Sequence, residues 1–258
     1  MALEPIGERR FRGHVDDEWT SLQGVHGGVV AALALTAAQR VLADADVDPT
    51  TTLRAATLGY VAGNVVGDID VDVEVVRRGR SLVTTHVRTV QADRTTTVAR
   101  FHHSQPWEGA AYSDVPPPSP RPEGTTRLHR EGARAHVNNV ETHLHPDTQM
   151  LGGSERAEWI AWSRPLDDST FDAPWLLMFG DYFPPAVFAR STTPVRAVTV
   201  EYSMQVHSAA GRWDLGDGYL GARMHAVHSH DGFAVEDGWI HLPDGGLLAT
   251  VRQTRLAG

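Results

Sequence analysis

Hydrophobic positions along the chain change their spacing, and each spacing predicts a different kind of element. Residues 27–42 are apolar on nearly every side of a helix, with Gln39 and Arg40 only near the end, which is typical of a helix buried on most sides. Over residues 68–75, acidic and aliphatic side chains alternate without a break, as in an antiparallel strand with one face in solvent. The first half of the chain therefore predicts a long buried helix followed by an antiparallel sheet.

The second half repeats this order of helix and strands. Asp172 and Pro174 are typical of a helix start, because an Asp side chain accepts hydrogen bonds from free backbone N–H groups and Pro fits the first turn. The predicted helix reaches Asp181 and is broken by Pro184 and Pro185. Strand patterns occur at residues 54–60, 82–91, 95–102, 137–144, 158–164, 197–206, 219–228, 233–241 and 247–253.

An internal repeat supports two related halves. Residues 54–60 and 196–202 share Arg, Ala, Thr and Tyr at matching positions, and each segment opens the strands that follow a buried helix. Prolines cluster between the halves and cannot pair inside a sheet, which indicates a linker. We therefore predict two domains, residues 1–105 and 134–258, joined by a Pro-rich linker at residues 106–133.

The composition is that of a globular protein and excludes several kinds of chemistry. The chain has 258 residues, of which 41% are hydrophobic and 21% charged. Its 23 basic and 32 acidic residues give a net charge of −9, which argues against general binding of nucleic acid or anionic membranes. The chain contains no cysteine, so disulfides, thiolate nucleophiles, iron–sulfur clusters and cysteine-bound zinc are excluded. Any catalysis must use other groups.

The N-terminal region lacks the features of a membrane segment. Its longest apolar run, residues 27–38, is shorter than the ~20 residues that cross a bilayer. Acidic residues 16–18 precede it, where a signal peptide carries basic residues. We therefore expect no membrane span and a cytoplasmic location.

Some of the 14 histidines are closely spaced. His143 and His145 form one pair, and His225, His228 and His230 form a second group. No carboxylate or further ligand accompanies them at a recognised metal-binding spacing. We therefore expect surface histidines and no metal site.

Several short motifs follow one another in the order of a known family. The most specific is the hairpin at residues 75–81, with a Gly-Arg-Ser turn and a Val-rich strand that ends in Gln91. The other matching segments are residues 11–13, 27–29, 180–181, 183–184, 199–204, 207, 244–245, 247–249 and 253. Together these motifs resemble the acyl-CoA thioesterases similar to bacterial thioesterase II, over about residues 10–103 and 134–256.

The resemblance implies a fold and a reaction. The fold is α+β, a double hotdog in which two repeats each consist of a long buried helix wrapped by an antiparallel β-sheet. The reaction is hydrolysis of acyl-CoA thioesters to free acid and CoA, a step of lipid metabolism that needs no cofactor. Acyl-CoA is then the expected partner, and the exposed faces of a hotdog leave room for a homo-oligomer.

The resemblance also implies a catalytic set of Asp181, Thr199 and Gln253, which together activate a water molecule. An Asp can accept the proton of the water while hydroxyl and amide groups orient it. Two neighbours depart from the family pattern: Glu201 and Tyr202 stand where an Asp-His pair is usual, and Thr254 stands where an acid is usual. These departures affect the surrounding hydrogen bonds and the substrate preference more than the set itself.

The residues alone support the three positions unequally. For Asp181 the alternative to a catalytic role is a structural one, since Asp is a favoured cap residue at the start of a helix. Gln253 alternates with apolar Ala249 and Val251, so its side chain is predicted to point inward. Thr199 instead alternates with Glu201 and Ser203 on the more polar face; a bulge in the strand would turn it inward, but the sequence shows no sign of one.

Further residues are candidates for binding. Backbone N–H groups of Gly27 and Gly28, at the start of the first helix, are expected to hold the oxyanion, which places the site across both halves. His26 precedes them and is a further candidate for substrate binding. A cluster of arginines is expected to bind the CoA phosphates: Arg77, Arg78, Arg80 and Arg88. Arginines exposed to solvent at the ends of strands are the alternative interpretation of the same cluster.

Two other functions remain open on the same fold. The first is a binding protein for acyl-CoA or acyl chains without catalysis, which ligand-induced thermal stabilisation without turnover would reveal. The second is a hydratase or dehydratase, which requires His26 or another base beside the acyl pocket. The sequence does not distinguish CoA from carrier-protein thioesters, and it does not indicate the acyl chain length.

Overall fold

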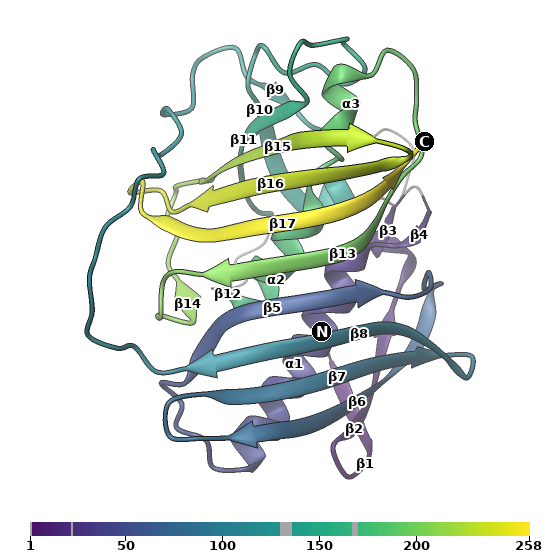
Figure 1. Ribbon diagram of the computed structural model, residues 1–258, viewed down its shortest axis with the longest axis vertical. Helices are drawn as coiled ribbons and strands as arrows, with labels where there is room; N and C mark the ends of the chain where they lie inside the picture. The colour runs from purple at the N-terminus through teal and green to yellow at the C-terminus, as the bar shows by residue number, and fades with distance from the viewer. Residues whose placement is uncertain (1, 22, 130–135, 167–169) are drawn as a thin grey trace.

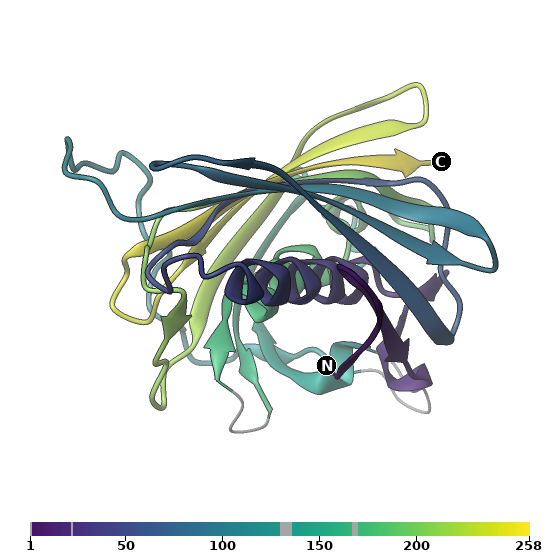
Figure 2. The same cartoon turned by 90° about the horizontal axis from the view of Figure 1, so that it is seen from below.

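The computed structural model describes residues 2–21, 23–129, 136–166 and 170–258. Its main feature is an antiparallel sheet of 13 strands that curves around the helices (Figures 1 and 2). In spatial order the strands are β1 (Leu3–Gly7), β2 (Arg10–Val15), β6 (Gly67–Arg78), β7 (Val83–Gln91), β8 (Arg94–Ser104), β5 (Thr52–Tyr60), β13 (Ala197–Val206), β17 (Leu247–Ala257), β16 (Phe233–His241), β15 (Leu220–His230), β11 (Glu158–Pro165), β10 (Val140–Leu144) and β9 (Thr126–Arg127).

Two strands from different halves of the chain meet at the centre of this sheet. β5 and β13 pair antiparallel, with Leu58 opposite Tyr202, and they contain the two similar sequence segments. Outward from this pair the order is β8, β7, β6 on one side and β17, β16, β15 on the other. Hydrogen bonds between β5 and β13 therefore join the halves into one continuous sheet.

The long helix α1 (Gly27–Asp44) lies inside the curve of the sheet, as Figure 2 shows. It is buried along most of its length, as its uninterrupted apolar sequence predicts. By length and composition α1 could cross a membrane, but 67% of it is buried inside the protein, as in a core helix. A Cβ at Gly13 of β2 would lie 2.5 Å from Leu33 Cδ1, so glycine allows this strand to pack closely on α1.

The second helix, α2 (Ala173–Tyr182), begins where the capping pattern predicts. The Asp172 side chain accepts a hydrogen bond from the Trp175 main-chain N–H at 3.1 Å. The helix ends before Pro184 and Pro185, and a short helix, α3 (Val187–Arg190), follows. A Cβ at Gly28 would lie 2.5 Å from the Met178 carbonyl oxygen, so the start of α1 packs directly on the backbone of α2.

Two predicted segments differ from the structure. Residues 137–144 were expected to form one strand, but a 3-10 turn (His136–Asn139) precedes β10, which starts only at Val140. The last strand continues to Ala257, four residues beyond the predicted end at Gln253.

Short elements complete the described structure. They are η1 (Asp17–Trp19), the ribbon of β3 (Thr20–Ser21) and β4 (Gly24–Val25), and the ribbon of β12 (Phe171–Asp172) and β14 (Arg212–Trp213).

The Pro-rich segment runs along the outside of the molecule from β8 to β9 (Figure 1). It is in contact with the second half, because a Cβ at Gly221 would lie 2.4 Å from Pro118 Cγ. Residues 130–133 of the predicted linker lie outside the described residues.

Candidate active site

Asp181 occupies the last turn of α2, where its side chain is 4% exposed and faces the start of α1. The main-chain N–H of Gly28, in the first turn of α1, favours the charged form of this carboxylate and lowers its pKa. The C-terminal end of a helix disfavours a negative charge and the N-terminal end favours one. The carboxylate at the end of α2 is therefore stabilised by the first turn of α1, which comes from the other half of the chain.

Thr199 points at Asp181 because β13 contains a bulge. In the pairing with β17, Thr199 lies opposite Arg255 and Glu201 lies opposite Thr254, so the register shifts at Val200. Thr199 Oγ1 lies 3.1 Å from Asp181 Oδ1, to which it donates a hydrogen bond. The bulge resolves the conflict in the alternation pattern and brings the hydroxyl to the inner face.

Gln253 lies on β17 with its side chain buried, as its alternation with Val251 predicts. Its Nε2 donates to the carbonyl oxygen of Gly180 at 3.0 Å, and its Oε1 lies 3.3 Å from Thr199 Oγ1. The structure thus brings together the three side chains expected to activate water. They come from α2, β13 and β17.

Side chains also satisfy the carbonyl groups at the end of α2, which have no partner within the helix. Gln253 bonds Gly180, and His26 Nε2 donates to the Asp181 carbonyl oxygen at 3.0 Å. One turn earlier Tyr202, which replaces the usual His of the family pattern, donates from its hydroxyl to the Leu177 carbonyl at 2.8 Å. These contacts hold the turn that carries Asp181.

His26 lies beside the carboxylate but is held neutral. Burial lowers its pKa to about 4, and its ring stacks on His136 with 4.1 Å between centroids. Burial and the neighbouring His26 lower the pKa of His136 to about 3. Since its Nε2 donates to a carbonyl oxygen, His26 positions the end of α2.

Burial raises the pKa of Asp181 above its usual value. The positive charge of Arg255 opposes this effect most strongly, followed by the hydrogen bond from Thr199 and the influences of His136 and Gly28. A buried carboxylate with a raised pKa is a stronger base than an exposed one, which suits proton removal from water.

The sequence prediction missed Arg255 and Glu236. Arg255 Nη1 donates to Thr199 Oγ1 at 2.7 Å, and its Nη2 donates to Glu236 Oε1 at 3.1 Å. Both side chains are buried. The signal was present, because Arg255 continues the inward alternation of Val251 and Gln253, but that strand was expected to end at Gln253.

Tyr60, at the end of β5, was also missed. Its hydroxyl oxygen is buried and has no hydrogen-bond partner within the described part of the chain. Tyr60 and Asp181 both lie close to Gly27, because a Cβ at this glycine would be 2.9 Å from Asp181 Oδ2 and 3.0 Å from Tyr60 Cζ. Burial and the charge of Asp181 raise the pKa of Tyr60 well above its usual value, so the hydroxyl is a hydrogen-bond donor.

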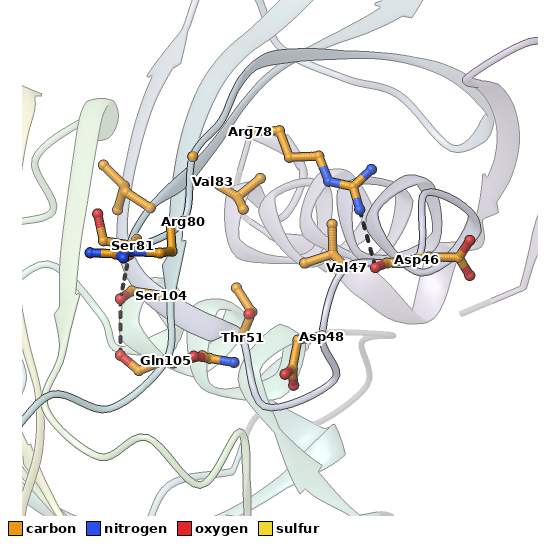
Figure 3. A pocket seen from close by; sticks show the side chains of 12 residues that line it. Asp46, Val47, Asp48, Thr51, Arg78, Arg80, Ser81, Val83, Ser104 and Gln105 are labelled. Carbon is orange, nitrogen blue, oxygen red and sulfur yellow. Dashed lines mark hydrogen bonds between the residues drawn. The ribbon is translucent and has the colours of Figure 1, made fainter.

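The arginines expected to bind the CoA phosphates lie far from Asp181. Arg78 and Arg80 line a pocket of about 130 Å³ at the turn between β6 and β7, and Arg78 Nη2 donates to the Asp46 carbonyl at 3.2 Å (Figure 3). Arg77 lies in β6, directly before this turn, and pairs with Thr84 of β7. Asp46 follows the C-terminal end of α1, whereas Asp181 lies at its N-terminal end, and 18 helical residues span about 27 Å.

Arg88 is separate from this turn. It lies exposed on β7 and pairs with Asp72 at 2.9 Å. The four arginines therefore do not form one cluster, and the structure does not bring them to the carboxylate. Their proximity in sequence reflects a hairpin whose turn and strand present side chains to different surfaces.

The histidine groups do not converge. Across the parts of the chain that the structure describes, no group of three or more His, Asp or Glu side chains is arranged to hold a metal ion. His143 instead bonds Glu141 at 2.9 Å, and His230 lies exposed beside Asp231.

Solved structures share this fold over nearly their whole length. A hot dog fold protein of unknown function from Alicyclobacillus acidocaldarius is 23% identical, with a TM-score of 0.87, 100% of this chain and 96% of that chain covered. A putative thioesterase II from Thermobifida fusca is 19% identical, with a TM-score of 0.85 and coverage of 100% and 95%. Acyl-CoA thioesterase II TesB2 from Mycobacterium marinum is 22% identical, with a TM-score of 0.79 and coverage of 100% and 96%. The likeness establishes a hotdog fold.

Family models assign both halves of the sequence. The N-terminal domain of acyl-CoA thioesterases matches residues 15–103, and the C-terminal domain matches residues 108–257. Among curated proteins none matches this sequence. The two domain models together span most of the chain, which therefore belongs to the acyl-CoA thioesterase family and is a thioester hydrolase.

Proposed function

We propose that the protein hydrolyses acyl-CoA thioesters to the free acid and CoA with a water molecule activated by Asp181, Thr199 and Gln253. The observation that carries the proposal is the convergence of these side chains at the start of α1, with 3.1 Å and 3.3 Å between Thr199 Oγ1 and its two neighbours. A carboxylate, a hydroxyl and an amide in this arrangement can orient water and accept its proton.

The first step forms a tetrahedral intermediate. Asp181 takes one proton from the water molecule, while the oxygen of that water forms a bond to the thioester carbonyl carbon. Thr199 and Gln253 hold the water in line with that carbon. The carbonyl oxygen gains the negative charge, so the site needs donors on the opposite side of the carbon.

Donors for this charge come from the first half of the chain. We assign the role to the N–H groups at Gly27 and Gly28, together with the Tyr60 hydroxyl, which is buried and unpartnered among the residues described. The Gly28 N–H also acts on the Asp181 carboxylate, whereas the Tyr60 hydroxyl has no competing partner among the residues described. His26 holds the end of α2 in place.

The second step releases the products. The intermediate collapses to a carboxylic acid, and the bond between the carbonyl carbon and sulfur breaks. The sulfur leaves with the proton held by Asp181, which gives free CoA and restores the carboxylate. One water is consumed for each thioester, and no cofactor takes part.

We propose that Arg77, Arg78 and Arg80 bind the CoA phosphates. The fold sets one requirement for this binding. The CoA must extend along α1, about 27 Å from the carboxylate to the arginine turn. Replacing Arg80 by Ala should then raise KM for acyl-CoA and leave kcat unchanged. If KM is unaltered, the phosphates bind elsewhere.

We further propose that the fold is a double hotdog made by duplication, with repeats at residues 1–105 and 134–258 and the linker at 106–133. The mirrored strand order about β5 and β13 supports it, as does the similarity of residues 54–60 to 196–202. Limited proteolysis within residues 106–125 should leave two fragments that stay associated and active. Separation of the fragments under native conditions would contradict this.

The test of the function uses an acyl-CoA panel of different chain lengths and detects released CoA thiol. Asp181→Asn should reduce kcat by about 10³-fold or more, because the amide cannot accept the proton. The same change removes a buried charge with a raised pKa, so the melting temperature should rise. Asp237→Asn, on the solvent side of β16, is the matched control and should retain activity.

Two outcomes contradict the proposal. Hydrolysis by Asp181→Asn at the unaltered rate rejects the mechanism. Thermal stabilisation of the unaltered protein by acyl-CoA without release of CoA from any chain length favours the binding protein instead.

A further inference from the structure

We propose that the buried pair of Glu236 and Arg255 is a positioning device of the active site: Arg255 fixes the Thr199 hydroxyl and keeps Asp181 ionised, and Glu236 limits the strength of this effect. The inference rests on the proposed function, in which Asp181 is the base. It adds two residues to the site that lie one strand apart on β16 and β17.

The pair is part of a buried chain of contacts that ends at the catalytic carboxylate. The Ala186 main-chain N–H donates to Glu236 Oε2, and Glu236 Oε1 accepts from Arg255 Nη2 at 3.1 Å. Arg255 Nη1 then donates to Thr199 Oγ1 at 2.7 Å, and Thr199 donates to Asp181 Oδ1 at 3.1 Å. Every link is a hydrogen bond between buried or half-buried groups.

The contact from Arg255 decides where the Thr199 proton points. A hydroxyl has one proton to donate and accepts through its lone pairs. Because Arg255 donates to this oxygen, the Thr199 proton is directed to the other side, where Asp181 Oδ1 and Gln253 Oε1 lie. Without Arg255 the hydroxyl can rotate away from the carboxylate.

Arg255 also brings a positive charge to the carboxylate. Arg255 Nη1 and Asp181 Oδ1 both form a hydrogen bond with Thr199 Oγ1, so these two atoms lie at most about 6 Å apart. At this distance an opposite charge favours the ionised carboxylate. Glu236 reduces the effect of this positive charge on Asp181, because its negative carboxylate binds Nη2 of the same guanidinium. The two residues therefore act on Asp181 in opposite directions.

The other titratable groups near Asp181 carry little charge. His26 and His136 are neutral, with pKa values of about 4 and about 3. Burial raises the pKa of Tyr60 and of Tyr202 well above the usual value, so both hydroxyls stay protonated. Among the groups described around this carboxyl, Arg255 is thus the one that opposes its protonation most strongly, ahead of His136.

The same two strands offer a matched control on their opposite face. Arg252 of β17 pairs with Asp237 of β16 at 2.6 Å, but its side chain is exposed to solvent. The outer pair has the same charges on the same two strands, although Arg252 lies directly opposite Asp237 whereas Arg255 lies opposite Ala234 and reaches Glu236 diagonally. It lacks contact with Thr199.

The experiment measures kcat/KM for an acyl-CoA against pH and follows the acidic limb, where activity falls as Asp181 is protonated. In Arg255→Met/Glu236→Leu the limb should move to higher pH by about one unit, and kcat should fall about tenfold. Replacing both residues avoids leaving one buried charge unpaired, so the protein should fold. Arg252→Met/Asp237→Leu should leave the limb in place.

A second variant predicts the opposite shift. Glu236→Gln keeps the shape and one acceptor oxygen but removes the negative charge, so the acidic limb should move to lower pH. Arg255→Lys keeps the positive charge, so its acidic limb should stay near the pH at which the unaltered enzyme has it. One ammonium group cannot bind both Thr199 and Glu236 as the guanidinium does. A purely structural role changes the melting temperature without moving the limb in two directions.

The outcomes separate this inference from the function on which it rests. If Asp181→Asn keeps its activity, the proposed function fails. If Asp181→Asn is inactive but the limb does not move in Glu236→Gln, or moves to higher pH, only the role of the pair is overturned. Should the Arg255→Met/Glu236→Leu variant not fold, Glu236→Gln decides alone.

Discussion

At Asp181 two opposing effects act on one carboxyl group. Burial disfavours its charge, while Arg255, Thr199 and the Gly28 N–H favour it, and the net result is a raised pKa. The sequence supplied the residue type and its place near the end of a helix. The alternation of β17 indicates that Arg255 points inward, but no local pattern predicts its contact with Thr199, which depends on the register between two strands.

Tyr60 gives the clearest prediction at this scale. Tyr60→Phe removes one buried hydroxyl that has no partner among the described residues, so the melting temperature should stay the same or rise. If the hydroxyl holds the oxyanion, kcat should fall by about 10²-fold, with KM little changed. Measuring both quantities on the same preparation separates catalysis from stability.

Tyr202→Phe is the comparison for Tyr60→Phe, since its hydroxyl bonds the Leu177 carbonyl. It should lower the melting temperature, because a buried carbonyl loses its partner. A kcat for Tyr60→Phe within twofold of the unaltered enzyme would remove Tyr60 from the site.

Among the elements, the bulge in β13 decides whether the site exists. The alternating pattern over residues 197–206 predicts the strand but places Thr199 on the outer face. The extra residue at Val200 reverses the side on which Thr199 emerges. Such a bulge leaves no reliable trace in a single sequence, because Val is equally at home in a regular strand.

Deleting Val200 should therefore abolish hydrolysis as fully as Thr199→Ala. The deletion restores regular pairing with β17 and turns the hydroxyl outward. Val200→Ala keeps the bulge and should retain activity. Activity in the deletion variant, measured as CoA release with the fold checked by circular dichroism, would show that the position of Thr199 is not needed.

The helices were more predictable than the edges of the sheet. Residues 27–42 and the Asp172 cap predicted α1 and α2, since continuous apolar sequence and capping are local signals. β1 and β2 were not predicted, although β2 alternates buried and exposed residues along its length. Its exposed positions carry Arg and His, and Arg10 and Arg12 pair with Asp70 of β6, a partner far away in sequence.

For the whole molecule, several buried neutral histidines predict acid sensitivity. Burial lowers the pKa of His26 and of His103 to about 4 and that of His136 to about 3, whereas an unfolded chain binds these protons near pH 6.5. Between these values the unfolded state binds more protons than the folded state, so the free energy of unfolding falls as the pH falls. The melting temperature should therefore be several degrees lower at pH 5 than at pH 7.5.

His103→Leu provides the control for acid sensitivity. Both ring nitrogens of His103 are buried without a partner among the residues described, so the change should raise the melting temperature at pH 5 more than at pH 7.5. A melting temperature that does not depend on pH between 5 and 7.5 would contradict the assignment of these histidines as neutral.

The sequence by itself determined the helices, most of the strands, the hotdog family and the residue types of the proposed catalytic set, because these depend on local periodicity and short motifs. Tertiary structure alone decided that Thr199 faces inward, that Arg255 and Tyr60 join the carboxylate, and that the arginine hairpin lies at the far end of α1. The physical reason is that a site between two halves is made by cross-strand register and helix packing, which join residues that no local pattern connects.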